Sequence, residues 1–258
     1  MSSIQIIRDF ASPQEGFSRT LRIYTPDGYD PAASDRRYPV LYLHDGQNVF
    51  AHPESALYDT WCANHALDSL VREGQLEPWI VVAVDSRDNR LSEYSPWDEP
   101  RSHVLARGEP YVRFFVDTLK PFIDSHWLTR QGPAWTGVMG SSMGGLISLY
   151  LGWRYPELFG RIGGLSPSVM WSYGRLFHEW TSHTHRWTRI YLDAGVHENI
   201  DPVGYWMFYG QATRDFYFHL KNLGYGDHEL HLVLDPEGGH NERDWQRRLP
   251  EALRWLLR

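Results

Sequence analysis

The sequence predicts an α/β fold with a mainly parallel central sheet, an antiparallel N-terminal edge and helices on both faces. Short β-rich runs alternate with longer helical segments along the chain, which is typical of a sheet covered by helices. The run YPVLYLH at residues 38–44 is apolar throughout, as expected of a strand buried on both faces. The first two β-rich runs follow each other without a helix between them, so we expect them to pair antiparallel at one edge.

Each element is predicted from its apolar pattern and its Gly or Pro boundaries. The predicted strands are residues 4–10, 19–24, 38–44, 79–85, 134–139, 159–165, 189–194 and 228–235. The predicted helices are residues 59–72, 111–126, 143–154, 205–223 and the tail from Glu242, which Pro250 is expected to break. No segment rich in Pro, Gly or Ser divides the chain, so we expect one domain over residues 1–258.

Composition excludes several classes of protein. The 258 residues carry 25 basic and 32 acidic side chains, a net charge of −7, which argues against nucleic-acid binding. No apolar run approaches the roughly 18 residues of a membrane span. The first residues lack a basic segment followed by an apolar one, so no secretory signal is visible and we expect a cytoplasmic protein. Cys62 is the sole cysteine, which excludes an intrachain disulfide and a thiolate metal cluster.

The segment GSSMGG, residues 140–145, lies between a predicted strand and a predicted helix. It contains the pattern G-x-S-x-G in the strand–turn–helix setting of an exposed nucleophile. The glycines two residues on either side of Ser142 relieve clashes in a sharp turn, so we predict Ser142 as the nucleophile. Its neighbour Ser141 is flanked at the same spacing by Met139 and Met143, which give no such relief.

A serine hydroxyl needs a base to take its proton, and that base needs a third group to orient it. Among 13 histidines, His240 alone follows the last predicted strand and precedes the terminal helix, so we predict it as the base. The acid is expected after the strand at 189–194. We favour Glu198, which lies just past a Gly turn, and keep Asp193 as the alternative because a side chain at the strand end bonds local backbone more readily.

Two backbone N–H donors are needed where negative charge develops on the substrate oxygen. We predict the N–H of Met143, the residue after the nucleophile, as one donor. The loop HDGQNVF after the third strand supplies the other, and Gln47 is our choice because Gly46 allows a close backbone approach. The alternative interpretation of this loop is a plain turn capped by Asp45.

Several segments together resemble the putative esterase family of α/β-hydrolases, related to esterase D and the enterochelin esterases. The matching segments are YPVLYLHDGQNVF, residues 90–97, GSSMGG, LSPSVMW, LDAGVHEN and GGHNERDW, which span nearly the whole chain in family order. The resemblance implies an α/β-hydrolase fold and hydrolysis of carboxylic esters without a cofactor. By position, Ser142 matches the family nucleophile, His240 the base and Glu198 the acid.

These residues predict a serine esterase that acts on a small-molecule ester through an acyl-enzyme, without a metal, cofactor, nucleic acid or membrane. The segment His183-x-His185 has no adjacent acidic residue and predicts no metal site. The alternatives are a siderophore trilactone esterase, an acyltransferase, and a non-catalytic binding module of the same fold. Labelling of Ser142 by a fluorophosphonate separates the enzymes from the module.

Aromatic residues make up 15% of the chain, with 12 Trp, which is more than a core requires. We predict that Trp97 and Trp171 bind substrate, with Trp180, Trp187 and Trp206 as further candidates for the cleft wall, and that Trp135 and Trp245 lie in the core. An aromatic-lined pocket would suit a hydrophobic or aryl ester. The 86–108 segment is too long for a bare connection; we expect an Arg90–Glu93 pair to hold it, with a surface excursion as the alternative.

Overall fold

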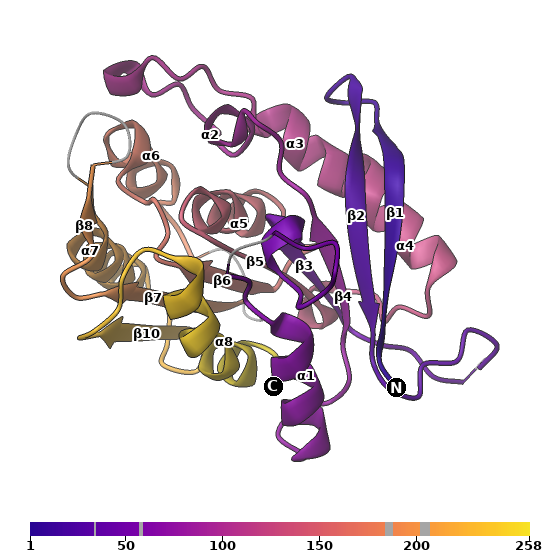
Figure 1. Ribbon diagram of the computed structural model, residues 1–258. Helices are drawn as coiled ribbons and strands as arrows, with labels where there is room; N and C mark the ends of the chain where they lie inside the picture. Colours follow the sequence, from indigo (N-terminus) through magenta and orange to yellow (C-terminus); the bar gives the residue numbers. More distant parts are fainter. Residues whose placement is uncertain (34, 57–58, 184–187, 202–206) are drawn as a thin grey trace.

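The computed structural model describes residues 1–33, 35–56, 59–183, 188–201 and 207–258. Within these residues the chain forms a central sheet of eight strands in the order β1-β2-β4-β3-β5-β6-β7-β10 (Figure 1). Strands β3 to β10 of this sheet run parallel, whereas β2 is antiparallel to both β1 and β4. The predicted fold, a mainly parallel sheet with an antiparallel N-terminal edge, is therefore confirmed.

The strands lie close to the predicted positions. Their bounds are β1 Ser3–Ser12, β2 Phe17–Thr25, β3 Val40–His44, β4 Ile80–Val84, β5 Thr136–Ser141, β6 Arg161–Leu165, β7 Arg189–Gly195 and β10 Leu230–Asp235. A separate short hairpin pairs β8 Asn199–Ile200 with β9 Met207–Phe208. All side chains of β3 and β4 are buried, which agrees with the unbroken apolar runs in their sequences.

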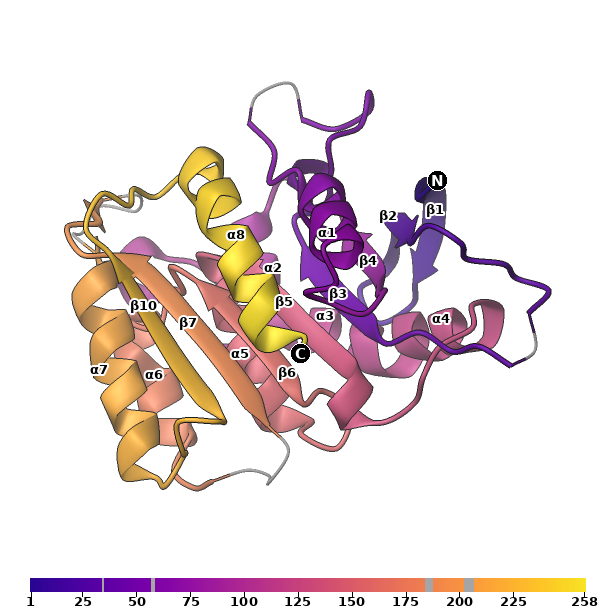
Figure 2. The ribbon, with the colours of Figure 1, turned by 90° about the horizontal axis from the view of Figure 1, so that it is seen from below.

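Helices cover both faces of the sheet. Their bounds are α1 Ala63–Arg72, α2 Arg90–Glu93, α3 Gly108–Phe114, α4 Lys120–His126, α5 Met143–Arg154, α6 Trp171–Glu179, α7 Tyr209–Asn222 and α8 Glu242–Leu256. One π-helical turn, η3 Phe115–Leu119, joins α3 to α4, and three short 3₁₀ turns are η1 Gly46–Asn48, η2 Pro100–Ser102 and η4 Pro133–Trp135. Helices α1 and α8 lie on one face, and α3, α5 and α7 lie on the other (Figures 1 and 2).

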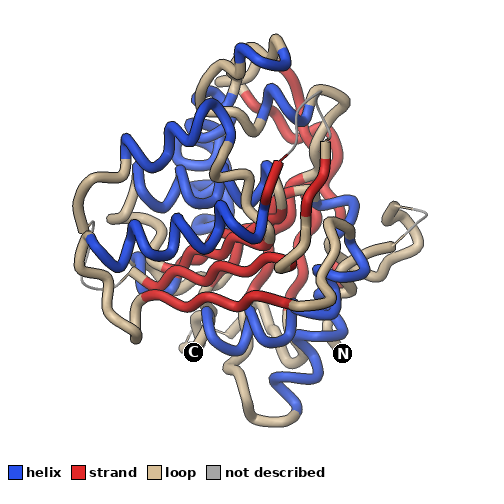
Figure 3. Tube along the Cα trace, turned by 90° about the vertical axis from the view of Figure 1, so that its left-hand side faces the viewer, coloured by secondary structure: helices blue, strands red, loops and turns tan. Residues whose placement is uncertain are grey.

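Helices lie on both sides of the sheet (Figure 3). The buried side chains form two apolar cores, one on each face of the sheet. The α5 side chains Leu146 and Ile147 belong to the first core, together with Phe216 of α7. Leu67 of α1 and Leu253 of α8 belong to the second. Ten consecutive residues of α5 are buried, so this helix is fixed on all sides directly behind the end of β5.

Three local predictions are wrong. The helix predicted from residue 59 begins at Ala63, because Cys62 has a left-handed φ of 48°. Helix α6 was not predicted; three of its residues have left-handed backbone angles, which disrupts the apolar period. Helix α8 runs through Pro250 without the expected break, since its buried face packs against the sheet and this burial outweighs the lost backbone hydrogen bond.

Candidate active site

The turn between β5 and α5 carries Ser142 at an unusual backbone geometry. Its φ is 56° and its ψ is −122°, a strained combination for a residue with a Cβ. A Cβ on Gly140 would lie 2.6 Å from the backbone of Gly144, so the turn can be this tight only with glycine there. At Gly144 the nearest neighbour of a Cβ is the Asp45 side chain at 3.2 Å, so that glycine relieves a side-chain contact rather than the predicted backbone clash.

Ser142, His240 and Glu198 form a hydrogen-bonded chain. The Oγ of Ser142 lies 2.9 Å from His240 Nε2, and His240 Nδ1 contacts Glu198 Oε1 in a short hydrogen bond. The other carboxylate oxygen of Glu198 accepts the Gly195 N–H at 2.7 Å and the Ser166 hydroxyl at 2.9 Å. The Glu198 side chain is fully buried, whereas that of His240 is 11% exposed. This arrangement can remove the proton from a serine hydroxyl and stabilise the imidazolium that results.

Two aromatic rings fix the plane of the His240 imidazole. The Tyr209 ring lies 4.2 Å from it, centroid to centroid, and the Trp245 ring meets it edge-on at 4.9 Å. The Tyr209 hydroxyl is 3.3 Å from Ser168 Oγ, which is itself 3.5 Å from Ser142 Oγ. Burial raises the pKa of Tyr209, so its hydroxyl keeps its proton near neutral pH.

Among the described residues, the alternative candidates for the nucleophile and the acid, Ser141 and Asp193, make no hydrogen bond to His240. Ser141 is the last residue of β5, and the structure brings its neighbour Ser142, rather than Ser141, to His240. Asp193 is fully buried and lies 3.3 Å from both the backbone N–H of Ser166 and the guanidinium of Arg248. Burial raises the pKa of Asp193 to about 7, although the Arg248 guanidinium lowers it. Asp193 therefore bonds backbone, as expected of a side chain at the end of its strand.

The predicted oxyanion donors lie on two sides of the turn. Met143 is the first residue of α5, so no preceding helical turn supplies an acceptor for its N–H. The Gln47 side chain is bonded twice to Ser86, at 2.6 and 3.0 Å, which leaves its backbone N–H as the available donor. Gly46 is required there because a Cβ would come within 2.5 Å of the Asp85 carboxylate.

A cavity of about 310 Å³ opens beside Ser142 and His240. It is lined by Asp45, Gln47, Asn48, Trp61, Arg90, Ser141, Ser142, His240, Glu242 and Trp245. Most of these side chains are polar or charged, and Trp61 and Trp245 form its aromatic part. A pocket of this size and lining accommodates a small or medium ligand with polar groups.

The predicted roles of Trp97 and Trp171 do not match this cavity, since neither residue lines it. The Trp171 indole is buried and donates to Ser95 Oγ at 2.6 Å, while Trp97 packs edge-on against Tyr150 at 5.4 Å. Trp180 is also buried and donates to Tyr225, so it is part of the core.

The remaining tryptophan predictions have mixed outcomes. Trp187 and Trp206 lie outside the described residues. Trp245 is 5% exposed and belongs to the second core, as predicted, and it also lines the cavity. Trp135, also predicted as core, is only half-buried. Position along the chain did not separate cleft from core because both kinds of tryptophan follow strands.

The 86–108 segment is anchored to the nucleophile turn by a different ion pair from the one predicted. Arg90 does not pair with Glu93; its guanidinium binds both oxygens of Asp45, at 2.6 and 2.8 Å, and donates to the Ser141 carbonyl at 3.2 Å. Glu93 instead pairs with the buried Arg19 at 3.0 Å. The side chain of Asp45 therefore clamps the segment and does not cap its own loop.

Sequence patterns missed Asp45, Arg90, Tyr209, Ser166 and Arg248 as neighbours of the site. A usable signal was present for two of them, since Asp45 and Ser166 directly follow strands β3 and β6. Arg90, Tyr209 and Arg248 lie on helices whose orientation no local pattern reveals.

No three His, Cys, Asp or Glu side chains in the described ranges are grouped so that they could hold a metal ion. His183 pairs with Glu229 at 3.0 Å, and His185 lies outside the described residues. No helix in the same ranges is both long enough and apolar enough to cross a membrane.

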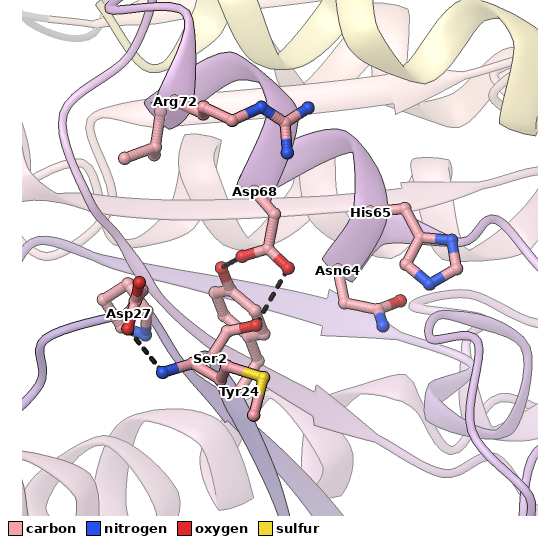
Figure 4. A pocket seen from close by; sticks show the side chains of 10 residues that line it. Ser2, Tyr24, Asp27, Asn64, His65, Asp68 and Arg72 are labelled. Carbon is pink, nitrogen blue, oxygen red and sulfur yellow. Dashed lines mark hydrogen bonds and ion pairs between the residues drawn. The ribbon is translucent and has the colours of Figure 1, made fainter.

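A larger cavity, of about 590 Å³, lies between the N-terminal residues, the end of β2 and α1 (Figure 4). Its central polar groups bond one another: the Tyr24 hydroxyl and the Ser2 hydroxyl both donate to Asp68, at 2.7 and 2.8 Å. None of the predicted catalytic residues lines it, so size alone does not identify the candidate site.

The fold and the strand–turn–helix position of Ser142 define the class of protein as an α/β-hydrolase. A family model described as "Putative esterase" matches residues 12–256, and the chain belongs to this family. It is an enzyme that acts as a carboxylic ester hydrolase.

Three comparisons illustrate this relationship. Protein YbbA of Bacillus subtilis (strain 168), described as uncharacterized, is 23% identical over 252 residues, or 95% of each chain. The iron(III) enterobactin esterase of Dickeya dadantii (strain 3937) is 25% identical over 97% of this chain, which spans only 54% of that protein. A solved IroE-like serine hydrolase from Shewanella oneidensis has the same fold, with a TM-score of 0.80 at 20% identity over 99% of this chain and 80% of that one.

Proposed function

We propose that the chain forms one domain that hydrolyses a small or medium carboxylic ester through a Ser142–His240–Glu198 triad. The hydrogen-bonded chain from Ser142 Oγ through the imidazole to a fully buried carboxylate is the observation that supports this proposal. Three side chains from the ends of β5, β7 and β10, far apart in sequence, meet at the edge of the sheet where α/β folds bind ligands.

The reaction proceeds in two steps. Ser142 Oγ attacks the ester carbonyl carbon while His240 Nε2 takes the hydroxyl proton, and the Met143 and Gln47 N–H groups stabilise the oxyanion. The tetrahedral intermediate expels the alcohol, which receives the proton from His240, and leaves an acyl group on Ser142. Water then attacks this acyl-enzyme with His240 as base, which releases the carboxylic acid and restores the serine.

The cavity beside Ser142 favours an ester that carries both an aromatic ring and polar substituents. Trp61 and Trp245 form the aromatic part of its wall, while Asp45, Arg90 and Asn48 form part of its polar wall. A purely hydrophobic ester would make no hydrogen bonds to these polar groups. The similarity to an enterobactin esterase supports a second candidate, a siderophore trilactone.

Labelling with a fluorophosphonate, followed by intact-mass measurement, tests the nucleophile. We expect one adduct on the wild type and none on Ser142→Ala, whose kcat should fall roughly 10⁶-fold if the triad acts as a unit. The matched control is Ser141→Ala, which removes the neighbouring hydroxyl and should still be labelled. Absence of labelling on the wild type would support the binding module, and labelling of Ser142→Ala would contradict the assignment.

Substrate class is tested with three sets of esters: short alkyl acetates, hydroxylated aryl esters and a catecholate trilactone. We expect the highest kcat/KM on hydroxylated aryl esters. A marked preference for simple acetates would contradict the aryl proposal, and a preference for the trilactone would favour the second candidate. Addition of an alcohol acceptor separates a hydrolase from an acyltransferase through the ratio of free acid to new ester.

A further inference from the structure

Ser166 is a buried serine with a strained backbone directly beneath the candidate triad. It follows the last residue of β6, is fully buried and has a left-handed φ of 44°. Its N–H donates to the Asp193 carbonyl at 2.7 Å, which holds the backbone in this conformation. Non-glycine residues with left-handed backbone angles are uncommon and concentrate at functional sites, so we looked for a functional role of the Ser166 side chain.

The hydroxyl of Ser166 has three hydrogen-bond partners whose directions can be assigned. Trp245 Nε1 lies 3.1 Å from it, Arg248 Nη2 2.9 Å and Glu198 Oε2 2.9 Å. An indole N–H and a guanidinium can only donate, so together they occupy both lone pairs of the hydroxyl oxygen. The single hydroxyl hydrogen must therefore point to Glu198.

We propose that Ser166 is a positioning residue that links the guanidinium of Arg248 to the Glu198 carboxylate and thereby keeps this carboxylate aimed at His240. This inference rests on the proposed triad and adds the group that orients its acid. With Gly195 N–H and Ser166 both donating to Oε2, the oxygen Oε1 remains for His240 Nδ1. The imidazole then carries its hydrogen on Nδ1 and offers Nε2 to the Ser142 hydroxyl.

Arg248 is suited to this role because its other contacts are weak. The residue is 5% exposed, and its guanidinium spans the ends of three strands, with Ser166 after β6, Asp193 in β7 and Asp235 in β10. The distances to Asp193 and Asp235 are 3.3 and 3.6 Å, and neither Nε nor Nη1 of Arg248 makes a hydrogen bond in the described structure. The well-formed hydrogen bond of this guanidinium is the one to Ser166.

The titratable groups that surround Glu198 are His240, Asp193 on β7, Tyr209 on α7 and Arg248 on α8. Arg248 is the sole permanent cation among these four. Loss of Arg248 removes a positive charge close to the Glu198–His240 pair, and loss of the Ser166 hydroxyl removes a hydrogen-bond donor to it. The pH at which the active protonation state forms should then move upward.

The test compares Ser166→Ala, Arg248→Met and the double variant with the wild type, on a hydroxylated aryl acetate between pH 5 and 9. Ser166→Ala loses a hydrogen bond to a charged group, so we expect kcat to fall roughly tenfold while KM stays within about twofold. The acid limb of its kcat/KM profile should move up by about one pH unit. Arg248→Met should move the limb in the same direction. If the charge acts through Ser166, the double variant should be no slower than Ser166→Ala.

Three controls make the outcome decisive. Ser166→Gly accepts the left-handed φ without strain and should reproduce the shift of Ser166→Ala if folding is not the cause. Thr213→Val deletes a buried hydroxyl on α7 that has no hydrogen-bond partner and should leave the pH profile in place. Ser142 labelling is measured on every variant, so that a failure of the triad itself appears as loss of labelling in the wild type.

The proposal is overturned if labelled, folded Ser166→Gly keeps the wild-type acid limb, or if it raises KM with kcat unchanged. Additive effects of Ser166→Ala and Arg248→Met would also overturn it, because they would show that the two side chains act independently. A shift of the acid limb in both single variants with a non-additive double variant supports it.

Discussion

Two Asp–Arg pairs flank the candidate site, and they differ in geometry. Asp45 and Arg90 form a bidentate pair, at 2.6 and 2.8 Å, beside the nucleophile turn. Asp193 and Arg248 approach to 3.3 Å below the acid without a hydrogen bond between them. Burial alone would raise the pKa of both carboxyls, but Arg90 holds that of Asp45 below its usual range, whereas that of Asp193 rises to about 7.

The difference shows how one pair of residue types can serve two purposes. A well-aligned guanidinium satisfies its carboxylate and locks two segments together, here residues 86–108 and the nucleophile turn. A poorly aligned guanidinium keeps N–H groups free to donate to a third group. Here Arg248 donates to Ser166, which in turn donates to Glu198. The first pair is expected to act on stability, and the second on the protonation state of the site.

The largest effect is expected when the aligned pair is broken. Arg90→Met leaves the Asp45 carboxylate buried without its guanidinium partner, so we expect the free energy of unfolding in urea to fall by about 3 kcal/mol. The matched control is Arg113→Met, which removes an exposed i,i+4 pair with Asp117 and should leave the urea midpoint unchanged. Equal midpoints for the two variants would show that the bidentate pair adds no stability.

The second prediction contrasts the pH dependence of the two carboxyls. Because the folded pKa of Asp193 is raised, its contribution to stability is greatest below the unfolded value near 3.8 and declines as pH rises toward 7. Relative to Asp193→Asn, the wild type should therefore lose about 2 to 3 kcal/mol of unfolding free energy between pH 4 and pH 7.

The pKa of Asp45 is shifted in the opposite direction to that of Asp193. Its folded pKa is lowered, so its contribution is present above pH 4 and is lost only as pH falls further. The stability difference between the wild type and Asp45→Asn should stay flat from pH 4 to pH 7. Parallel pH curves for the two Asp→Asn variants would remove the distinction between the pairs.

The smallest effect concerns the second donor to Ser166. Trp245→Phe keeps a ring against His240 but deletes the indole N–H, so we expect kcat to fall roughly threefold, less than for Ser166→Ala, because Arg248 still donates. Trp61→Phe is the comparison variant. Trp61 lines the same cavity and packs edge-on against Trp245, but it donates no hydrogen bond to Ser166, so we expect it to change kcat less than Trp245→Phe does. Steady-state kinetics of both variants on one aryl ester give the comparison.

The sequence predicted the residues of the hydrogen-bonded chain because each follows a strand in a local pattern. Ser142 lies between glycines at a strand–helix junction, Glu198 follows a Gly turn and His240 precedes the last helix. The structure brings these three side chains together, while their catalytic roles remain the proposal tested above. The cavity lining was predicted poorly: Trp97, Trp171 and Trp180 pack in the interior away from the cavity, and Trp245, which is in the core as predicted, also lines it.

By itself, the sequence determined the strands of the central sheet, its antiparallel edge and the turn that carries Ser142, because these show in local residue patterns. Only the tertiary structure decided that Arg90 pairs with Asp45 rather than Glu93, and that Arg248 of α8 reaches Ser166 after β6, 82 residues away in the chain. The physical reason is that a long charged side chain bonds whichever group the packing of whole helices places beside it, and no local pattern encodes that packing.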